Sequence, residues 1–419
     1  MQLAEHFNSR GIIVVIVQYR LGFWGFFSHD DGEKIGNLGL YDQRMALKFV
    51  NKYIHHFNGD PERVTLWGNS AGSVSVHAHT LAPKSQSYFQ YAIQSSGSLY
   101  NLWSHTKNTY TVSKEVARNL KCTQTDSAEL KKCLKDAPIF KIQYAINELT
   151  NGSTRAPMRS GMDLFWWTPV MDEEFFGDNL EGTTNEKIEK LTRDSKVKSV
   201  MYGLTKGEGL LFTLQTGNPV SSVFATELGR TVKQQDSYTE ENFKNHLDSF
   251  VVTQETAGAN LTIIKNMLQG FYLNKTEADG TETKWYRRLT DIQTDSQFAG
   301  GVIQEISDKL IWRPEINNYI YMFNYYLTDC VPYFPYFKNQ TNSVERDFIN
   351  KLVDAMAKFV KHGDPAQAAG VAWPKVTSTT KIEYLMVGKK VETGSSYYNN
   401  IAALWKNIYA SGYGKNMDS

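Results

Sequence analysis

The sequence has almost no excess of charge of either sign and no long apolar run. Lysine and arginine number 45 and aspartate and glutamate 44, so the 419-residue chain has a formal net charge of +1. Without a basic or acidic excess, nothing indicates a nucleic acid, an anionic membrane or a polyanionic substrate as partner. The longest apolar run, residues 12–17, falls far short of the roughly 18–20 residues that cross a bilayer and has the length of a buried strand.

Targeting signals and cofactor motifs are also missing. Residues 1–6 contain no basic stretch followed by an apolar one, so no signal peptide is visible, and the C-terminal residues carry no anchor signal. The sequence has no metal-ligand cluster, phosphate-binding loop or dinucleotide fingerprint. We therefore expect no metal and no cofactor.

Cysteine is scarce, with three residues in the whole chain. Cys122 and Cys133 flank a short helical stretch and Cys330 stands alone, and the spacing leaves open whether the first two are bonded or are buried thiols. Four Asn-X-Ser/Thr triplets are candidates for glycosylation, although a chain this rich in Asn, Ser and Thr produces such triplets by chance. They begin at Asn151, Asn260, Asn274 and Asn339.

The N-terminal quarter of the sequence alternates between strand and helix patterns. The β-branched run at residues 11–19 predicts a parallel strand that is buried on both faces. A helical pattern follows at 42–57, then a strand at 64–67, a small-residue helix at 71–81 and a strand at 91–94. This alternation predicts an α/β fold with a doubly wound parallel sheet.

Later segments are less regular. Residues 105–165 are predicted to be mainly helical, 198–202 and 319–325 to be strands, and 343–361 to be an amphipathic helix. No internal repeat, low-complexity block or linker divides the chain, so the sequence predicts one domain over residues 1–419.

The stretch Gly68-Asn69-Ser70-Ala71-Gly72 matches the G-x-S-x-G pattern of a nucleophile elbow. The match follows a strand and opens a helix, which is the setting that the pattern requires. The glycines let the strand and the helix approach, while the serine takes a strained backbone conformation. The helix N-terminus would place the Ala71 N–H near an oxyanion. Ser70 is therefore the candidate nucleophile, and the alternative is a Gly/Ser-rich turn without chemistry.

The elbow and several other stretches resemble the type-B carboxylesterase and cholinesterase family. The resemblance implies an α/β-hydrolase fold, with a central, mostly parallel sheet and helices on both faces, and hydrolysis of carboxylic esters through an acyl-serine. The matching stretches follow the family's order over essentially the whole chain, at residues 14–22, 37–44, 57–72, 92–98, 168–172, 362–365 and 373–374.

The resemblance assigns roles to individual residues. Ser70 matches the nucleophile, although the preceding Asn69 stands where the family usually has Glu or Gln. Glu208 matches the triad acid, and Ser96 matches a serine that hydrogen-bonds behind the triad. The resemblance also implies a structural ion pair between Arg44 and Asp60 and a disulfide between Cys122 and Cys133.

The resemblance breaks at the catalytic base. The family supplies a histidine from the loop after the strand matched by residues 319–325, and alignment of Val331-Pro332-Tyr333-Phe334 puts Leu327 at that position. No other histidine lies near it in sequence. A serine without a base is a poor nucleophile, so we expect the chain as given to be inactive or impaired.

The family's His-Gly-Gly-Gly oxyanion loop, and the strand that feeds it, precede the point where this sequence begins. We therefore expect the first strands to be missing, through truncation or an incomplete gene model. The sheet would then have a gap between residues 12–19 and 64–67.

Three functions compete. The first is an esterase, whose partner would be a small-molecule carboxylic ester. The second is a non-catalytic, cholinesterase-like extracellular binding or adhesion domain, whose partner would be a protein. The third is a non-functional fragment. Nucleic acid is not expected as a partner, and the full-length form is expected to be secreted or extracellular.

Overall fold

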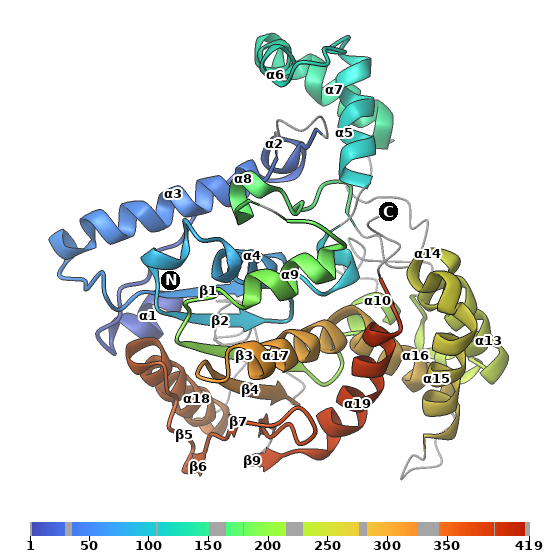
Figure 1. Cartoon of the computed structure of the whole chain (residues 1–419). Helices are drawn as coiled ribbons and strands as arrows, with labels where there is room; N and C mark the ends of the chain where they lie inside the picture. Colours follow the sequence, from blue (N-terminus) through green and yellow to red (C-terminus); the bar gives the residue numbers. More distant parts are fainter. Residues whose placement is uncertain are drawn as a thin grey trace.

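The computed structural model describes residues 2–29, 36–105, 108–150, 165–178, 180–214, 229–275, 283–324, 343–388 and 390–414. At its centre is a sheet with the strand order β1-β2-β3-β4-β8-β9, in which β7 also pairs with β4 (Figure 1). Strands β1, β2, β3, β4 and β8 are parallel, whereas β7 and β9 are antiparallel to their neighbours. Their bounds are β1 Thr65–Asn69, β2 Tyr91–Ser95, β3 Ser199–Thr205, β4 Asn317–Phe323, β7 Lys375–Val376, β8 Tyr384–Val387 and β9 Val391–Gly394.

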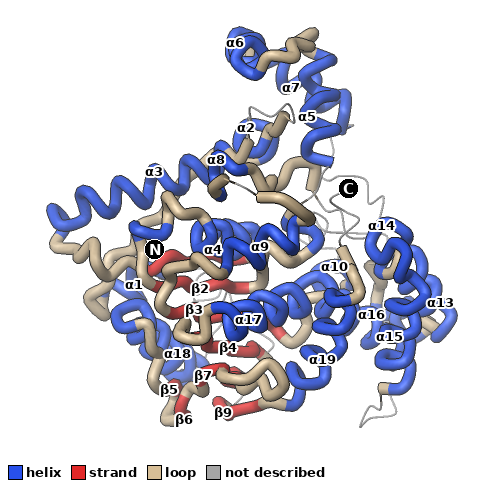
Figure 2. Tube along the Cα trace, viewed as in Figure 1, coloured by secondary structure: helices blue, strands red, loops and turns tan. Residues whose placement is uncertain are grey.

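Helices cover both faces of this sheet, and the strands lie between them (Figure 2). One face packs against α4 (Ala71–Leu81), α17 (Gly300–Trp312) and α19 (Ser396–Ala410), the other against α1 (Gln2–Asn8) and α18 (Ser343–His362). In β3, Val200 and Tyr202 belong to the first apolar layer and Met201 to the second. Because side chains alternate along a strand, a strand covered on both faces needs a continuous apolar run.

Most elements that the sequence predicts are present, and the α/β fold is confirmed. The strands predicted at 64–67, 91–94, 198–202 and 319–325 correspond to β1, β2, β3 and β4, and residue 325 lies outside the described residues. The helix predicted at 71–81 is α4, and the one at 343–361 is α18. The helical pattern at 42–57 corresponds to α3 (Leu38–Tyr53) followed by the 3-10 helix η1 (Ile54–Phe57).

Residues 12–19 do not form the predicted buried strand. The segment belongs to no strand, and residues Ile13, Val15 and Ile16 are 43%, 49% and 69% exposed. Within the described residues β1 pairs with β2 alone, and a cavity of about 600 Å³ lies in the expected gap, lined by residues 12–17 and 64–69. An apolar run becomes a strand only when a neighbour accepts its backbone hydrogen bonds, and none lies beside this one in the described chain.

The ion pair expected between Arg44 and Asp60 is not formed. Asp60 instead pairs with Arg63, three residues along the same turn, at 2.7 Å. The Arg44 guanidinium lies over the ring of Tyr41, 4.4 Å from its centroid, and over Phe175 at 5.2 Å. The turn gives Asp60 a closer cation, and α3 directs Arg44 towards aromatic faces that attract it.

A helical lobe projects from the body of the molecule (Figure 1). It consists of α5 (Asn108–Asn119), α6 (Ser127–Asp136) and α7 (Ile139–Thr150), which agrees with the helical prediction for this part of the chain. Cys122 and Cys133 form a disulfide, with Cα atoms 5.7 Å apart, as the resemblance implies. Cys122 is buried with Val116, Leu130 and Ile142 in a small core of the lobe. Cys330, Asn151 and Asn339 lie outside the described residues.

A second group of helices stands near the carboxyl ends of the strands (Figure 1). The loop after β3 contacts this group, because the Gly209 N–H donates to Thr294 Oγ1 at 2.9 Å. The bounds are α10 Leu210–Thr213, α13 Glu240–His246, α15 Leu261–Asn274 and α16 Lys284–Thr294.

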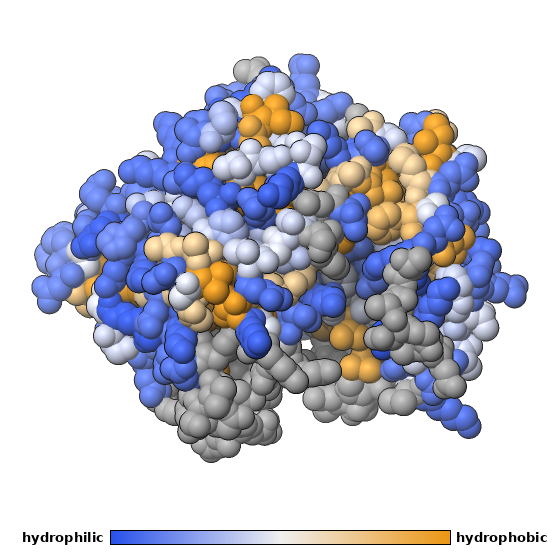
Figure 3. All heavy atoms as spheres, turned by 90° about the horizontal axis from the view of Figure 1, so that it is seen from below, coloured by the Kyte–Doolittle hydropathy of each residue, from blue (hydrophilic) through white to orange (hydrophobic). Residues whose placement is uncertain are grey.

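One face of the molecule is largely polar. Figure 3 shows one face on which hydrophilic side chains predominate and apolar residues gather in separate patches. Among the described residues, no helix combines the length and the apolarity that crossing a bilayer would require.

Candidate active site

Three site residues that the sequence predicts follow three neighbouring strands. Ser70 comes directly after β1, Ser96 directly after β2, and Glu208 lies in the turn after β3. Because these strands are parallel, their carboxyl ends share one edge of the sheet, which is where open α/β sheets place their ligand sites. Main-chain hydrogen bonds also connect the turns to the neighbouring strands. The Ser70 N–H donates to Ser95 O and the Ser96 N–H donates to Gly203 O, both at 2.8 Å.

The backbone of Ser70 has the strained geometry of an elbow. Its φ is 56° and its ψ −120°, a conformation that costs a non-glycine residue about 1–3 kcal/mol. The turn is so tight that a Cβ on Gly68 would lie 2.1 Å from Gly72 O, and one on Gly97 would lie 2.7 Å from Ser70 O. Close approach of the backbone therefore requires glycine at positions 68 and 97, whereas a Cβ on Gly72 would meet open space.

A hydrogen-bonded carboxylate lies beside the elbow. Glu208 Oε1 accepts from Ser96 Oγ at 2.7 Å and from the Thr205 N–H at 2.7 Å. Ser96 also has a left-handed backbone, with φ 57°, which turns its hydroxyl towards Glu208. These bonds fix the orientation of the carboxylate, as the third member of a triad requires.

Ser70 is open to a substrate. Ser70 and Ala71 are both exposed, and Ala71 is the first residue of α4, so its amide belongs to the positive end of the helix dipole. An acyl carbonyl carbon could approach the hydroxyl while its oxygen lies near the Ala71 N–H. Within the described residues, no group of three or more His, Cys, Asp or Glu is placed to hold a metal ion.

The buried histidines of the described residues bond to groups other than Ser70 and Glu208. Leu327, at the position matched to the base, lies outside the described residues, whereas all nine histidines lie within them. His77, His79 and His246 are buried, and burial lowers the pKa of His79 and of His246 to about 3. Their ring nitrogens lie 3.1, 3.0 and 2.7 Å from Ser98 Oγ, Ser85 Oγ and Gln293 Nε2.

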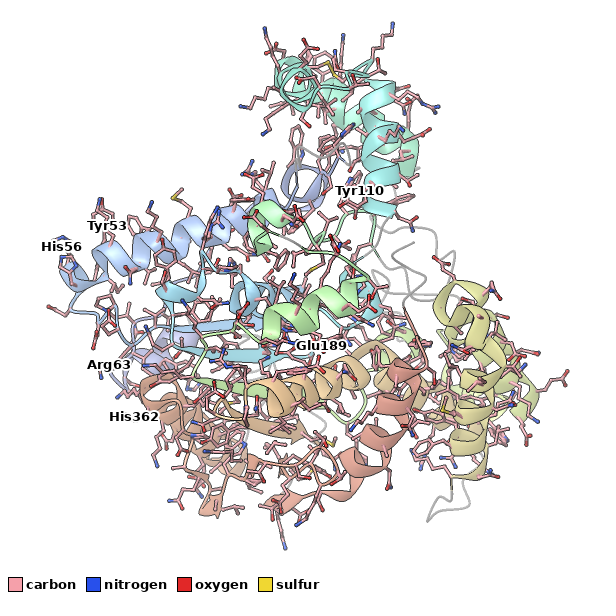
Figure 4. All side chains as sticks on the ribbon, in the orientation of Figure 1. Tyr53, His56, Arg63, Tyr110, Glu189 and His362 are labelled. Carbon is pink, nitrogen blue, oxygen red and sulfur yellow. A yellow bond between two sulfur atoms is a disulfide. The ribbon has the colours of Figure 1, made fainter. Side chains whose placement is uncertain are left out.

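Three further histidines lie at the opposite end of the sheet. His56 lies at the far end of α3 and His362 at the end of α18 (Figure 4). A Cβ on the adjacent Gly363 would contact Tyr91 and Ser199, the first residues of β2 and β3. His55 precedes His56 in the same 3-10 turn. His79 also contacts Gln43 Oε1 through its Nε2 at 3.0 Å.

Comparison with known proteins agrees with this geometry. The model of the carboxylesterase family matches residues 1–405. The chain belongs to the carboxylesterase family. Gut esterase 1 of Caenorhabditis elegans is 27% identical over 439 residues, covering 97% of this chain and 72% of the relative.

Two further relatives of this carboxylesterase-family chain differ in name from the gut esterase. Neuroligin-2 of Homo sapiens is 26% identical over 432 residues, which is 94% of this chain and 47% of the relative. The juvenile hormone esterase of Tribolium castaneum is 28% identical over 333 residues, which is 77% of this chain and 52% of the relative. The relatives therefore include proteins that are named as esterases and others that are not.

A buried charged group on α17 escaped prediction from the sequence. Glu305 and Lys309 form an ion pair with both side chains 0% exposed, and His77 lies against the same carboxylate. The available signal was a glutamate and a lysine four residues apart within a largely apolar helix. Their partners on other elements are more than 100 residues away, and no local pattern identifies them.

Proposed function

We propose that the chain is a carboxylesterase-type acyl-serine protein in which Ser70 holds the nucleophile position but ester turnover is strongly impaired. One observation carries this proposal: Ser70, Ser96 and Glu208 meet at one edge of the sheet, whereas the position matched to the base is Leu327. A leucine cannot accept the serine proton. In a serine protease, loss of the triad base lowers kcat by about a millionfold.

The proposed substrate class is a small-molecule carboxylic ester. The exposed hydroxyl of Ser70 and the N-terminus of α4 are arranged for attack on a carbonyl and for stabilisation of the resulting oxyanion. The names of several relatives, including a gut esterase and a juvenile hormone esterase, also indicate ester chemistry.

A fluorophosphonate probe tests the state of Ser70 without requiring turnover. We expect the unsubstituted chain to be labelled very slowly and Ser70→Ala not at all. Leu327→His should raise the labelling rate by roughly 10²–10⁴-fold, the usual contribution of a positioned general base. Ser70→Ala in the Leu327→His background is the matched control and should abolish that gain.

The proposal would be wrong if the unsubstituted chain were labelled as fast as Leu327→His and Ser70→Ala removed the label. Another group would then act as the base. If neither chain were labelled at Ser70, the elbow would not be a nucleophile position in this protein.

The similarity to neuroligin-2 over 94% of the chain favours a second candidate, a non-catalytic extracellular binding domain. In that case Ser70 would be dispensable. Saturable binding of the purified chain to intact cells should then be equal for the unsubstituted protein and Ser70→Ala. Absence of saturable binding would leave the esterase reading as the better one.

Extracellular location is the third element of the proposal. Two of the candidate glycosylation sites, Asn260 and Asn274, are exposed at the two ends of α15. Expression through a secretory pathway should give a protein whose mass falls on treatment with a glycosidase. Asn260→Gln and Asn274→Gln should each remove part of that difference, and an unchanged mass would count against these sites.

A further inference from the structure

The carboxylate of Glu305 is bonded to three separate elements of the fold. Its Oε2 accepts from Ser98 Oγ at 2.7 Å and Gln94 Nε2 at 3.0 Å, and lies 2.9 Å from His77 Nδ1. Its Oε1 accepts from the Tyr202 hydroxyl at 3.1 Å and from Lys309. Gln94 belongs to β2, Ser98 to the turn after it, His77 to α4 and Tyr202 to β3.

These are the same three elements that hold the candidate site residues. Ser70 is the N-cap residue of α4 and precedes His77 by about two helical turns, because an α-helix has 3.6 residues per turn. Ser96 lies between Gln94 and Ser98 in sequence. Glu208 follows the strand that contains Tyr202. One buried carboxylate on α17 thus joins the three segments whose relative positions define the site.

Charge within this cluster is balanced locally. Burial alone would raise the pKa of Glu305, but the adjacent His77 and Lys309 outweigh it and hold the pKa below its usual range, so the carboxylate is ionised. Burial lowers the pKa of His77, so its ring is neutral and Lys309 is the balancing cation. His77 Nδ1 lies 2.9 Å from the carboxylate and also accepts from the Leu99 N–H at 3.1 Å, so the ring is held between α17 and the turn after β2.

We propose that Glu305 is a positioning residue that sets the spacing of Ser70, Ser96 and Glu208. Glu305 touches none of these three and acts through His77, Ser98 and Tyr202. The effect of Glu305 on the reactivity of Ser70 rests on the proposed function. Its effect on the order of the turns can be measured independently of that function. The competing account is a polar cluster that stabilises the core without directing the site.

Paired substitutions avoid leaving a buried lysine without its counter-charge. Glu305→Gln with Lys309→Met retains an oxygen acceptor for Ser98 or Tyr202. Glu305→Met with Lys309→Met removes every hydrogen bond of the carboxylate at similar volume. Asp308→Asn is the control, because Asp308 is also buried on α17 but accepts from Tyr100 and Gln304.

Amide hydrogen exchange gives the readout that does not depend on chemistry. We expect exchange in the turns at residues 70–73 and 96–98 to rise at least tenfold in the Met pair, less in the Gln pair and not in Asp308→Asn. Each variant is also unfolded in urea, so that exchange can be compared at known global stability. Unchanged exchange in these turns, or changes that simply follow global stability across all three variants, would overturn the proposal.

Fluorophosphonate labelling gives the chemical readout. In the Leu327→His background we expect the Met pair to label at least tenfold more slowly than the Gln pair, with Asp308→Asn unchanged. Labelling of both pairs at the rate of the parent would overturn the positioning role. If the Leu327→His parent itself is not labelled, the proposed function fails, and the exchange experiment still decides the role of Glu305.

Discussion

Replacement of Ser70 by glycine should stabilise the fold. Ser70 has φ 56° and ψ −120°, and such a conformation costs a residue with a Cβ about 1–3 kcal/mol. Glycine removes that strain but adds roughly 0.5–1 kcal/mol of chain entropy that folding must overcome. The net gain in the free energy of unfolding is therefore about 1 kcal/mol relative to a residue that keeps its Cβ.

Ser70→Ala is the matched control, because it removes the hydroxyl and keeps the Cβ. We expect its stability to lie within about 0.5 kcal/mol of the unsubstituted chain, since the side chain is exposed. Both variants should lose any reactivity at this position. The main-chain bonds of Ser70 to Ser95 and Val74 are retained in both.

Urea unfolding followed by circular dichroism measures the difference between the two variants. The expected order of midpoints is Ser70→Gly above Ser70→Ala, at equal slopes. If glycine is no more stable than alanine, the elbow is not strained and the reasoning from its dihedral angles is wrong. Ser96→Gly provides a contrast. Glycine would relieve the backbone strain at φ 57°, but the stability gained is offset by loss of the hydrogen bond from Ser96 to Glu208.

Three other outcomes follow from described contacts. Replacing Cys122 and Cys133 by alanine should lower stability by about 3 kcal/mol, the loop-closure value for a bridge between residues 11 apart, measured by urea unfolding with and without reductant. Burial raises the pKa of Asp308 to about 6, so the folded protein favours the protonated carboxyl group. The free energy of unfolding should therefore fall by up to roughly 3 kcal/mol as pH rises from about 4 to 6. Asp308→Asn should remove this pH dependence. Trp405→Ala should cost about 3–5 kcal/mol, because the side chain is fully buried, and an unchanged melting temperature would contradict its place in the core.

Local signals account for the parts of the fold and site that the sequence predicts. The apolar run of β3 is continuous because both faces of that strand are covered, and the elbow motif is confined to five residues. The positions of Ser96 and Glu208 came from resemblance, since an isolated loop glutamate carries no local signal. Their contact at 2.7 Å joins residues 112 positions apart.

The errors concern interactions that depend on a distant neighbour. Residues 12–19 have the composition of a strand, but pairing needs a backbone beside them. Arg44 had two plausible kinds of partner, a carboxylate and an aromatic face, and only the packing of α3 decides between them. The bonds of Glu305 to Gln94 and Ser98 span 211 and 207 residues, beyond any pattern that a single sequence reveals.

The one-sided pairing of β1 has a consequence for how the candidate site responds to heat. Within the described residues Ser70 follows a strand that has a neighbour on one side, whereas Glu208 follows β3, which is paired on both sides. Edge strands have a lower free energy of local opening than central strands. On warming, the serine should therefore lose its alignment with the carboxylate well before the sheet as a whole unfolds, so that reactivity and global melting would be separate transitions.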